Sequence, residues 1–368
     1  MPGPYSSSLH DTPSDFEQDR VRVVKLRILA VFSATALAGC VSLFEHLPYE
    51  VQTVPAAIET EPMTGVGDRA DDPALWVDAE DPARSLILGT NKEEGLVVYD
   101  LDGSKRQELL IGQLNNVDLR GDVAVASNDQ VNALSWFELT RDPARPVRHL
   151  GDTPVHRTEP YGVCLGRMAE VLVAGVTYKD GTAELWRFAG EQNGAVAAEL
   201  QRTEKLASQL EGCVFDDRYQ RLFIGEEEHG IWSLDLTDPE SAPLSVDTIR
   251  ARQGLVADVE GLSLYESPDG TGFLVASAQA ADRFIVYDRL PPHRVRGGFA
   301  VPESIDGRVD AVTHTAGLHA SSAPLPGYPR GLVIVQDDGN PDSGVDQNFK
   351  LVDWRVIERA LDLAVAED

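Results

Sequence analysis

Short apolar runs separated by polar turns recur along the chain, and they fall into pairs. The first pair covers residues 86–89 and 96–99, with the turn Asn91-Lys92-Glu93-Glu94-Gly95 between them. Runs of this length, bounded by turn residues, predict β-hairpins. Six such pairs occur, and their first strands begin at residues 86, 123, 171, 222, 273 and 332.

Each hairpin is preceded by another short strand that starts with polar residues, such as Asp71-Asp72 or Glu211. The unit recurs about every 49 residues, which predicts an all-β protein, a six-bladed β-propeller. A β-sandwich would not repeat with one unit length. We assign the propeller to residues 65–355. Residues 41–64 form a linker and a first edge segment, and residues 356–368 form a short C-terminal tail.

The N-terminal region has the pattern of an export signal. Basic residues between Arg20 and Arg27 precede the apolar run 28–37, which ends in Ala38-Gly39-Cys40. This predicts a cleavable signal peptide over residues 20–40, because the run is too short to span a bilayer. The end of the run resembles the bacterial lipobox, which implies lipidation at Cys40. The chain would then be exported and lipid-anchored on the periplasmic or cell-surface side. The alternative is a buried helix with a chance cysteine.

Residues 1–19 are polar, include several acids and fit no signal sequence. We therefore expect the native start to lie further along, at Val21 or Val23.

The net charge limits the classes of partner that the chain can bind, and the cysteine content limits its possible disulfides. The chain has 60 acidic residues against 32 lysines and arginines, a net charge of -28. This excludes a nucleic-acid partner and leaves membrane contact only through the lipid anchor. We expect a monomer acting on a small molecule. After Cys40, only Cys164 and Cys213 remain, and they either pair in an oxidising compartment or stay free.

Acidic residues occur at one phase of the repeat. In a propeller the inner strands converge on a central channel, so residues that lead these strands or sit in the hairpin turns share one end of it. The acids at this phase are Asp71, Asp72, Glu211, Glu226, Glu227, Asp258 and Glu260. Carboxylates this close need a counter-cation, and oxygen ligands favour Ca²⁺ over Mg²⁺.

Cations at the same phase come from the first three blades: Lys92, Arg120 and Lys179, beside Tyr161. Metal ions together with lysine and arginine suit a phosphate group. The metals would hold the attacking water. Each residue also has a plainer interpretation, as a turn former, a solvated hairpin tip, a surface lysine or a packing tyrosine. Their common register favours the functional interpretation.

Several motifs together resemble the β-propeller (alkaline) phytases, and 3-phytases in particular. They span residues 65–355 and include Asp71-Asp72-Pro73-Ala74-Leu75-Trp76, Asn115-Asn116-Val117-Asp118, Glu226-Glu227, Asp258-Val259-Glu260-Gly261, Gln336-Asp337 and Asn348-Phe349-Lys350. The resemblance implies hydrolysis of phosphate monoesters of myo-inositol hexakisphosphate (phytate), taken as its calcium complex, with several Ca²⁺ ions. One phosphate would be cleaved while a neighbouring one is held.

The resemblance also implies residue roles. The phosphate-binding residues would be Lys92, Arg120, Tyr161 and Lys179. The calcium ligands would be Asp72, Glu211, Glu227, Asp258 and Glu260, with Asp71 and Gln279 as further candidates. A calcium site nearer the sixth blade would use Gln336, Asp337 and Asn340.

Two positions depart from the family pattern. Glu93 stands where many members have a second lysine, and the entry to the sixth blade reads His314-Thr315-Ala316-Gly317 with His319 after it, where the family has an acidic run. These departures keep two alternatives open. One is a propeller phosphoesterase acting on another phosphorylated substrate, and the other is a non-catalytic calcium- or phosphate-binding surface lipoprotein.

Overall fold

The computed structural model describes residues 47–65, 67–192, 195–339 and 347–363. The predicted signal peptide, the segment 1–19, Cys40 and Asn340 lie outside the described residues. None of the described helices is long and apolar enough to cross a bilayer.

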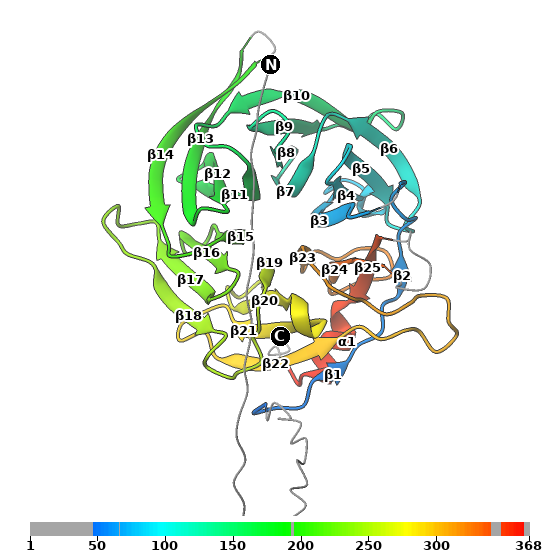
Figure 1. The fold of residues 1–368 in the computed structure, drawn as a ribbon. Helices are drawn as coiled ribbons and strands as arrows, with labels where there is room; N and C mark the ends of the chain where they lie inside the picture. Colours follow the sequence, from blue (N-terminus) through cyan, green and yellow to red (C-terminus); the bar gives the residue numbers. More distant parts are fainter. Residues whose placement is uncertain (1–46, 66, 193–194, 340–346, 364–368) are drawn as a thin grey trace, which may run out of the picture. The chain divides into compact units, whose positions relative to one another are not determined.

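Six β-sheets follow one another along the chain and form the blades of a propeller (Figure 1). Blade 1 contains, from the channel outward, β3 (Ala70–Trp76), β4 (Leu86–Asn91), β5 (Gly95–Asp100) and β6 (Lys105–Leu110). Blade 2 contains β7 (Leu114–Arg120), β8 (Val123–Asn128), β9 (Ala133–Leu139) and β10 (Val147–Pro154). Blade 3 contains β11 (Pro160–Met168), β12 (Val171–Tyr178), β13 (Thr182–Gln192) and β14 (Ala195–Lys205).

Blade 4 contains β15 (Leu210–Asp216), β16 (Arg221–Glu226), β17 (Gly230–Asp235) and β18 (Leu244–Thr248). Blade 5 contains β19 (Val259–Glu266), β20 (Gly272–Ala278), β21 (Arg283–Asp288) and β22 (Val295–Ala300). Blade 6 contains β23 (Leu318–Ser321), β24 (Leu332–Asp337) and β25 (Asn348–Asp353). Short 3₁₀ helices occupy Pro82–Arg84 and Gln279–Ala281.

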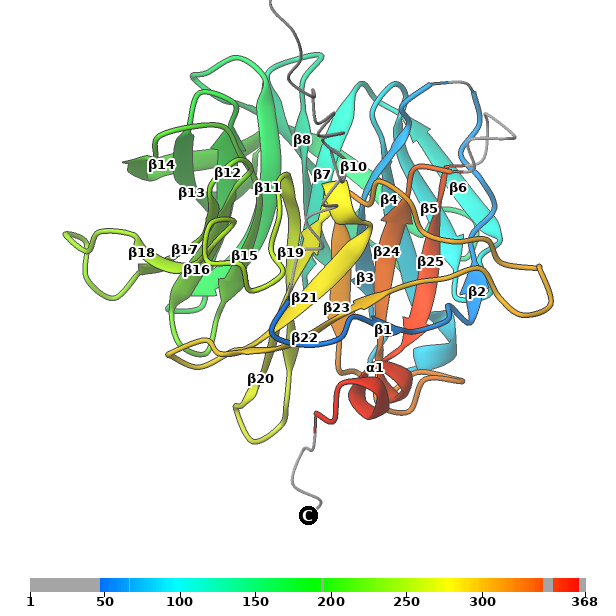
Figure 2. The ribbon, with the colours of Figure 1, turned by 60° about the horizontal axis from the view of Figure 1, so that its bottom comes forward.

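The N-terminal segment supplies the outer edges of the last two blades. β1 (Gln52–Thr53) pairs in parallel with β22, and Figure 2 shows it running along that strand. β2 (Ile58–Glu59) pairs antiparallel with β25 and becomes the fourth strand of blade 6. The start of the chain therefore completes the blade formed by its end, which closes the ring.

The core lies between neighbouring blades. Each innermost strand contacts those of the two adjacent sheets, from β3 with β7 round to β23 with β3. Six clusters of buried apolar side chains each fill the space between two successive blades. Inner strands such as β4 are therefore buried along their whole length, whereas the outer strand β6 alternates between half-buried and exposed positions. The predicted all-β six-bladed propeller is confirmed.

The C-terminal segment packs onto this core. Helix α1 (Trp354–Ala360) begins with Asp353 as its N-cap, and Trp354, Ile357 and Leu363 are buried in the cluster between blades 5 and 6. The Trp354 ring stacks on Tyr265 of β19, with ring centroids 3.7 Å apart.

Candidate functional site

The repeat places one residue from each of five blades at the same end of the channel. It is the second residue of each innermost strand, and in every case it lies within a shift of the pairing register, as in a β-bulge. These residues are Asp71, Asn115, Tyr161, Glu211 and Glu260. Close packing confirms that the strand starts meet, since Gly162 lies against the carbonyl of Glu211 and Gly212 against that of Glu260.

A second set of residues follows from the hairpin turns. The residue directly after the second strand of each blade lies at this same end of the sheet. Going round the ring, these residues are Lys92, Asp129, Lys179, Glu227, Gln279 and Asp338. We call this end of the channel the entry mouth. The predicted convergence of Lys92, Tyr161, Lys179, Glu211, Glu227 and Glu260 follows from these two positions.

Three buried carboxylates form the centre of the entry mouth. Glu211, Glu227 and Glu260 each offer an oxygen, and these oxygens lie within 4.8 Å of one another. Burial, together with the negative charge of Glu260, raises the pKa of Glu211 well above its usual range. Burial likewise raises the pKa of Glu260 to about 7. Gln209 donates a hydrogen bond to Glu227 at 2.5 Å.

This donor set fits a hard cation. Asp71 Oδ2 and Glu211 Oε2 are buried and accept no hydrogen bond from the described residues. Carboxylates held this close in a buried site keep a proton or take a counter-cation. Several carboxylate oxygens without sulfur or imidazole match the preference of Ca²⁺. Glu211, Glu227 and Glu260 would hold such an ion, with Asp71 beside them.

Two lysines flank the carboxylates. Lys92 Nζ lies 3.1 Å from both Asp68 and Asp71, and these charges raise its pKa against the opposing effect of burial. Lys179 Nζ lies 4.4 Å from the centroid of the Tyr161 ring. Burial, and then the charge of Glu211, raises the pKa of Tyr161, so this phenol stays protonated and can donate a hydrogen bond. The ammonium group of Lys92 therefore stays charged beside the carboxylates, as binding an anion requires.

The remaining predicted calcium ligands take different positions. The pKa of Glu227 is raised mainly by burial, and the negative charge of the nearby Asp258 raises it further. Asp72 instead bridges blades: its Oδ2 accepts a hydrogen bond from the Val117 amide at 3.0 Å. Its Oδ1 packs so closely against Gly317 that a Cβ there would lie 2.1 Å away. Both Asp72 oxygens thus face neighbouring backbone.

Glu226, also predicted at this phase, is directed into its own blade. Its two oxygens accept hydrogen bonds from Ser208 and from the Trp232 indole.

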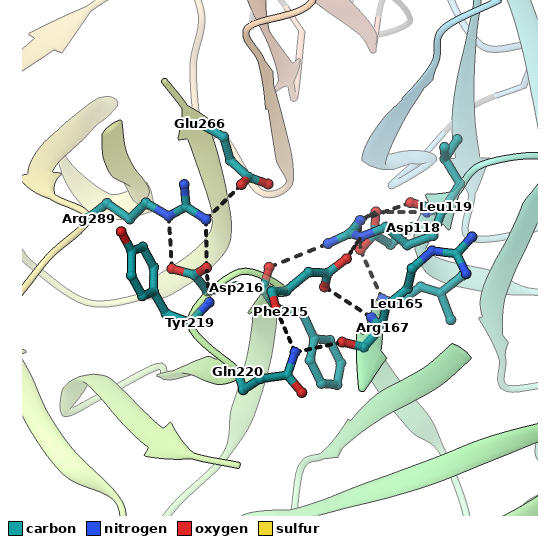
Figure 3. A network of polar contacts seen from close by, with 12 residues as sticks. Asp118, Leu119, Leu165, Arg167, Phe215, Asp216, Tyr219, Gln220, Glu266 and Arg289 are labelled. Carbon is teal, nitrogen blue, oxygen red and sulfur yellow. Dashed lines mark hydrogen bonds and ion pairs between the residues drawn. The ribbon is translucent and has the colours of Figure 1, made fainter. Parts of the chain in front are cut away.

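Arg120 does not reach the entry mouth, contrary to the prediction. It is the last residue of β7, whereas the mouth forms where the inner strands begin. Its guanidinium lies 3.3 Å from Asp118 and 3.2 Å from Asp217, which directly follows β15. Figure 3 shows this network, where Arg289 also bonds to Asp216 and Glu266, the last residues of β15 and β19. We call this end the far mouth; the structure does not bring Arg120 together with Lys92, Tyr161 and Lys179.

Gln336 and Asp337, two of the residues predicted to bind calcium in the sixth blade, form hydrogen bonds with other groups of the protein. Asp337 accepts a hydrogen bond from the buried Lys350 at 2.6 Å and another from the Thr313 amide at 2.8 Å. Gln336 accepts from the Ala316 amide at 2.7 Å and donates to the Ala70 carbonyl at 3.0 Å. By register, Asp337 matches Asn91 of blade 1, and Asp338 is the residue that matches Lys92.

The two histidines of the sixth-blade entry lie in separate cavities. His314 and Gln279 line a cleft of about 660 Å³ together with Lys92 and Asp338. His319 lines a separate cavity of about 390 Å³, which also contains Asp72 and Arg120. Burial lowers the pKa of His319 to about 4, so it is neutral at ordinary pH.

Three acids of the entry mouth were not predicted from the sequence: Asp68, Asp129 and Asp338. Asp68 pairs with Lys92, and the positive charges of Lys179 and Lys92 both act on Asp129, whose pKa is raised mainly by burial. The hairpin register alone would have found Asp129 and Asp338, because each directly follows the second strand of its blade.

The cysteines left open by the sequence form a disulfide. Cys164 of β11 and Cys213 of β15 are joined, with an S–S distance of 2.00 Å and their Cα atoms 5.6 Å apart.

The fold and this site define a six-bladed β-propeller with clustered buried carboxylates and flanking lysines at one mouth of its channel. The chain belongs to the phytase family, whose model matches residues 22–367. It is similar to the 3-phytase of Bacillus subtilis (strain 168), with 36% identity over 330 residues, covering 84% of this chain and 85% of that protein. The predicted family and enzyme class are therefore confirmed.

Proposed function

We propose that the protein hydrolyses phosphate monoesters of phytate in a calcium-dependent reaction with water as the nucleophile. The observation that carries this proposal is the entry mouth, where three buried carboxylates within 4.8 Å of one another adjoin the lysine-bearing turns. Membership of the phytase family and the likeness to a 3-phytase support the same substrate.

The lysines and carboxylates have different roles in this proposal. Lys92 and Lys179 bind phosphate oxygens from either side, and the protonated Tyr161 donates a hydrogen bond between them. Glu211, Glu227 and Glu260 hold calcium, with Asp71 and Asp258 at the edge of the same site. Bound calcium supplies charge neutralisation at the phosphoryl group and a more acidic water. The separate lysine turns allow one phosphate to be held while its neighbour reacts.

The charge of the protein favours a substrate that carries cations. The net charge is -28, and Asp68 and Asp71 already pair with Lys92. A free polyphosphate would be repelled by this field, whereas its calcium complex would not.

Phosphate release from phytate tests the proposal. We expect release with millimolar Ca²⁺, its loss with EDTA and its return when Ca²⁺ is added back. Lys92→Ala and Lys179→Ala should each lower kcat/KM by about a hundredfold or more, the scale for losing a charged transition-state contact. Lys105→Ala is the matched control, because Lys105 pairs with Glu108 on the outer strand β6. Normal turnover in both site variants would overturn the assigned site.

A second substrate is worth testing because Glu93 and Asp129 add negative charge near Lys92. Phytate should rank first in a panel of phosphate monoesters. A different ester ranking well above phytate would identify a phosphoesterase of the same fold with another substrate.

We also propose that the chain is exported and lipidated at Cys40, and the Cys164–Cys213 disulfide supports an oxidising compartment. Mass spectrometry of the mature protein should find an acylated N-terminal Cys40. A mature chain that starts with an unmodified Met1 would refute export.

A further inference from the structure

The Cys164–Cys213 disulfide crosses a junction between blades. Cys164 belongs to β11 of blade 3 and Cys213 to β15 of blade 4, and these innermost strands lie in different sheets. Neighbouring blades are therefore held together by side-chain packing and by individual polar contacts rather than by a ladder of backbone hydrogen bonds.

Similar hydrogen bonds link successive blades near the entry mouth. A hydroxyl from the second strand of one blade donates to a carbonyl at the start of the next inner strand, as Thr90 does to Asn115 and Thr177 to Glu211. Blades 2 and 3 have an additional link, in which Asp118 Oδ2 accepts from the Leu165 amide at 2.9 Å.

The disulfide takes the place of that carboxylate at the next junction. In each inner strand, pairing resumes after the bulge at Val117 of blade 2 and at Val163 of blade 3. Asp118 and Cys164 directly follow these residues and are therefore equivalent positions. The first reaches blade 3 through a hydrogen bond, and the second reaches blade 4 through a covalent bond.

The two blades that it joins each carry part of the site. Tyr161 lies three residues before Cys164, and the turn after the next strand of blade 3 carries Lys179. Glu211 lies two residues before Cys213, and blade 4 also carries Glu227. At about 3.3 Å per residue, the disulfide lies within about 10 Å along the chain of both groups. It therefore links the blade of Tyr161 and Lys179 to the blade of two of the proposed metal-binding carboxylates.

We propose that Cys164 and Cys213 are positioning residues, whose disulfide keeps the phosphate-binding and calcium-binding halves of the entry mouth in register. This inference rests on the function proposed above. Reduced thiols are weak hydrogen-bond partners and cannot replace the link. Blades 3 and 4 would then be held near the mouth by Thr177 and by apolar packing, which leaves Glu211 free to move relative to Tyr161.

Two double variants test the inference: Cys164→Ser with Cys213→Ser, and Cys164→Ala with Cys213→Ala. At about 20 °C, with folding checked by circular dichroism, we expect calcium affinity measured by calorimetry to fall several-fold and kcat to fall about tenfold. The control is Val286→Ala, which removes buried volume from β21 of blade 5. This variant should melt at a lower temperature but keep calcium affinity and kcat.

A second measurement needs no variant. Folded wild-type protein is treated with a phosphine reductant, which supplies two electrons as it is oxidised while two protons complete the two thiols. Thiol titration counts the product, and the same losses should accompany reduction. Wild-type calcium affinity and kcat in the folded disulfide-free protein would overturn the inference. If the oxidised wild type released no phosphate from phytate, the proposed function would fail instead, while the calcium calorimetry would still report on the disulfide.

Discussion

Arg120 should stabilise the fold rather than act in catalysis, and Arg120→Met tests this. Methionine keeps much of the aliphatic volume but removes the charge. Arg120 links β7 of blade 2 to Asp217, which follows β15 of blade 4, and so connects blades that are not adjacent in the ring. Its loss should therefore destabilise the far mouth and leave the entry mouth unchanged.

The size of the expected destabilisation depends on the hydrogen bonds that Asp118 and Asp217 keep after the substitution. Asp118 still accepts hydrogen bonds from the Leu165 and Leu119 amides, and Asp217 still accepts one from the Arg167 amide. Neither carboxylate is left bare, so the cost is below the 3–5 kcal/mol typical of breaking a fully buried pair. We expect a loss of about 2–3 kcal/mol in the free energy of unfolding. In a domain of this size that lowers the Tm by about 4–6 °C.

Urea unfolding and steady-state kinetics on the same preparations separate the two roles. Arg308→Met is the control, because the Arg308–Asp306 pair is exposed and should contribute no more than about 1 kcal/mol. Arg120→Met should keep wild-type kcat and KM for phytate at about 20 °C. An unchanged Tm with a large rise in KM would refute this reasoning and return Arg120 to the phosphate site.

Three further predictions concern other charged groups. Lys350→Met should cost about 3–5 kcal/mol in urea unfolding without altering KM, because Lys350 is fully buried and neutralises Asp337 and Asp310; an unchanged stability would contradict it. Asp129→Asn should lower KM for phytate a few-fold, because it removes a negative charge near Lys92 and Lys179; a higher KM would show that Asp129 helps to bind the substrate. Calcium affinity should fall as pH drops below about 7, because Glu260, whose pKa burial raises to about 7, must lose its proton to bind the metal; calorimetry in buffers of different ionisation enthalpy should detect proton release, and its absence would refute this.

The sequence was sufficient for the architecture because the repeat is local. Each blade carries its own apolar runs and turns, so the six hairpins could be located without any knowledge of their packing. The use of β2 to complete blade 6 was harder to predict, since Ile58–Glu59 is only two residues long and its partner strand is nearly 300 residues away. Only the closed ring brings these segments together.

Positions in the site were predictable where register alone decides them. Glu211 and Glu260 are each the second residue of an inner strand, and Lys92 and Lys179 each follow a second strand. Arg120 failed this test because it ends its strand, and one strand length carries it to the opposite mouth. The disulfide could not be deduced either, since only the packing of blades 3 and 4 brings its cysteines together.

The carboxylates at the two mouths of the channel differ in the charges that lie beside them. At the far mouth, Asp216 and Glu266 are paired with Arg289 (Figure 3). At the entry mouth, Glu211 and Glu260 adjoin one another, and the charge of Glu260 raises the pKa of Glu211 further. Acids that are clustered together are less stable than acids that pair with an arginine. A cation that binds only the folded state can restore the lost stability. This asymmetry supports the proposal that cations and phosphates bind at the mouth where the lysines lie.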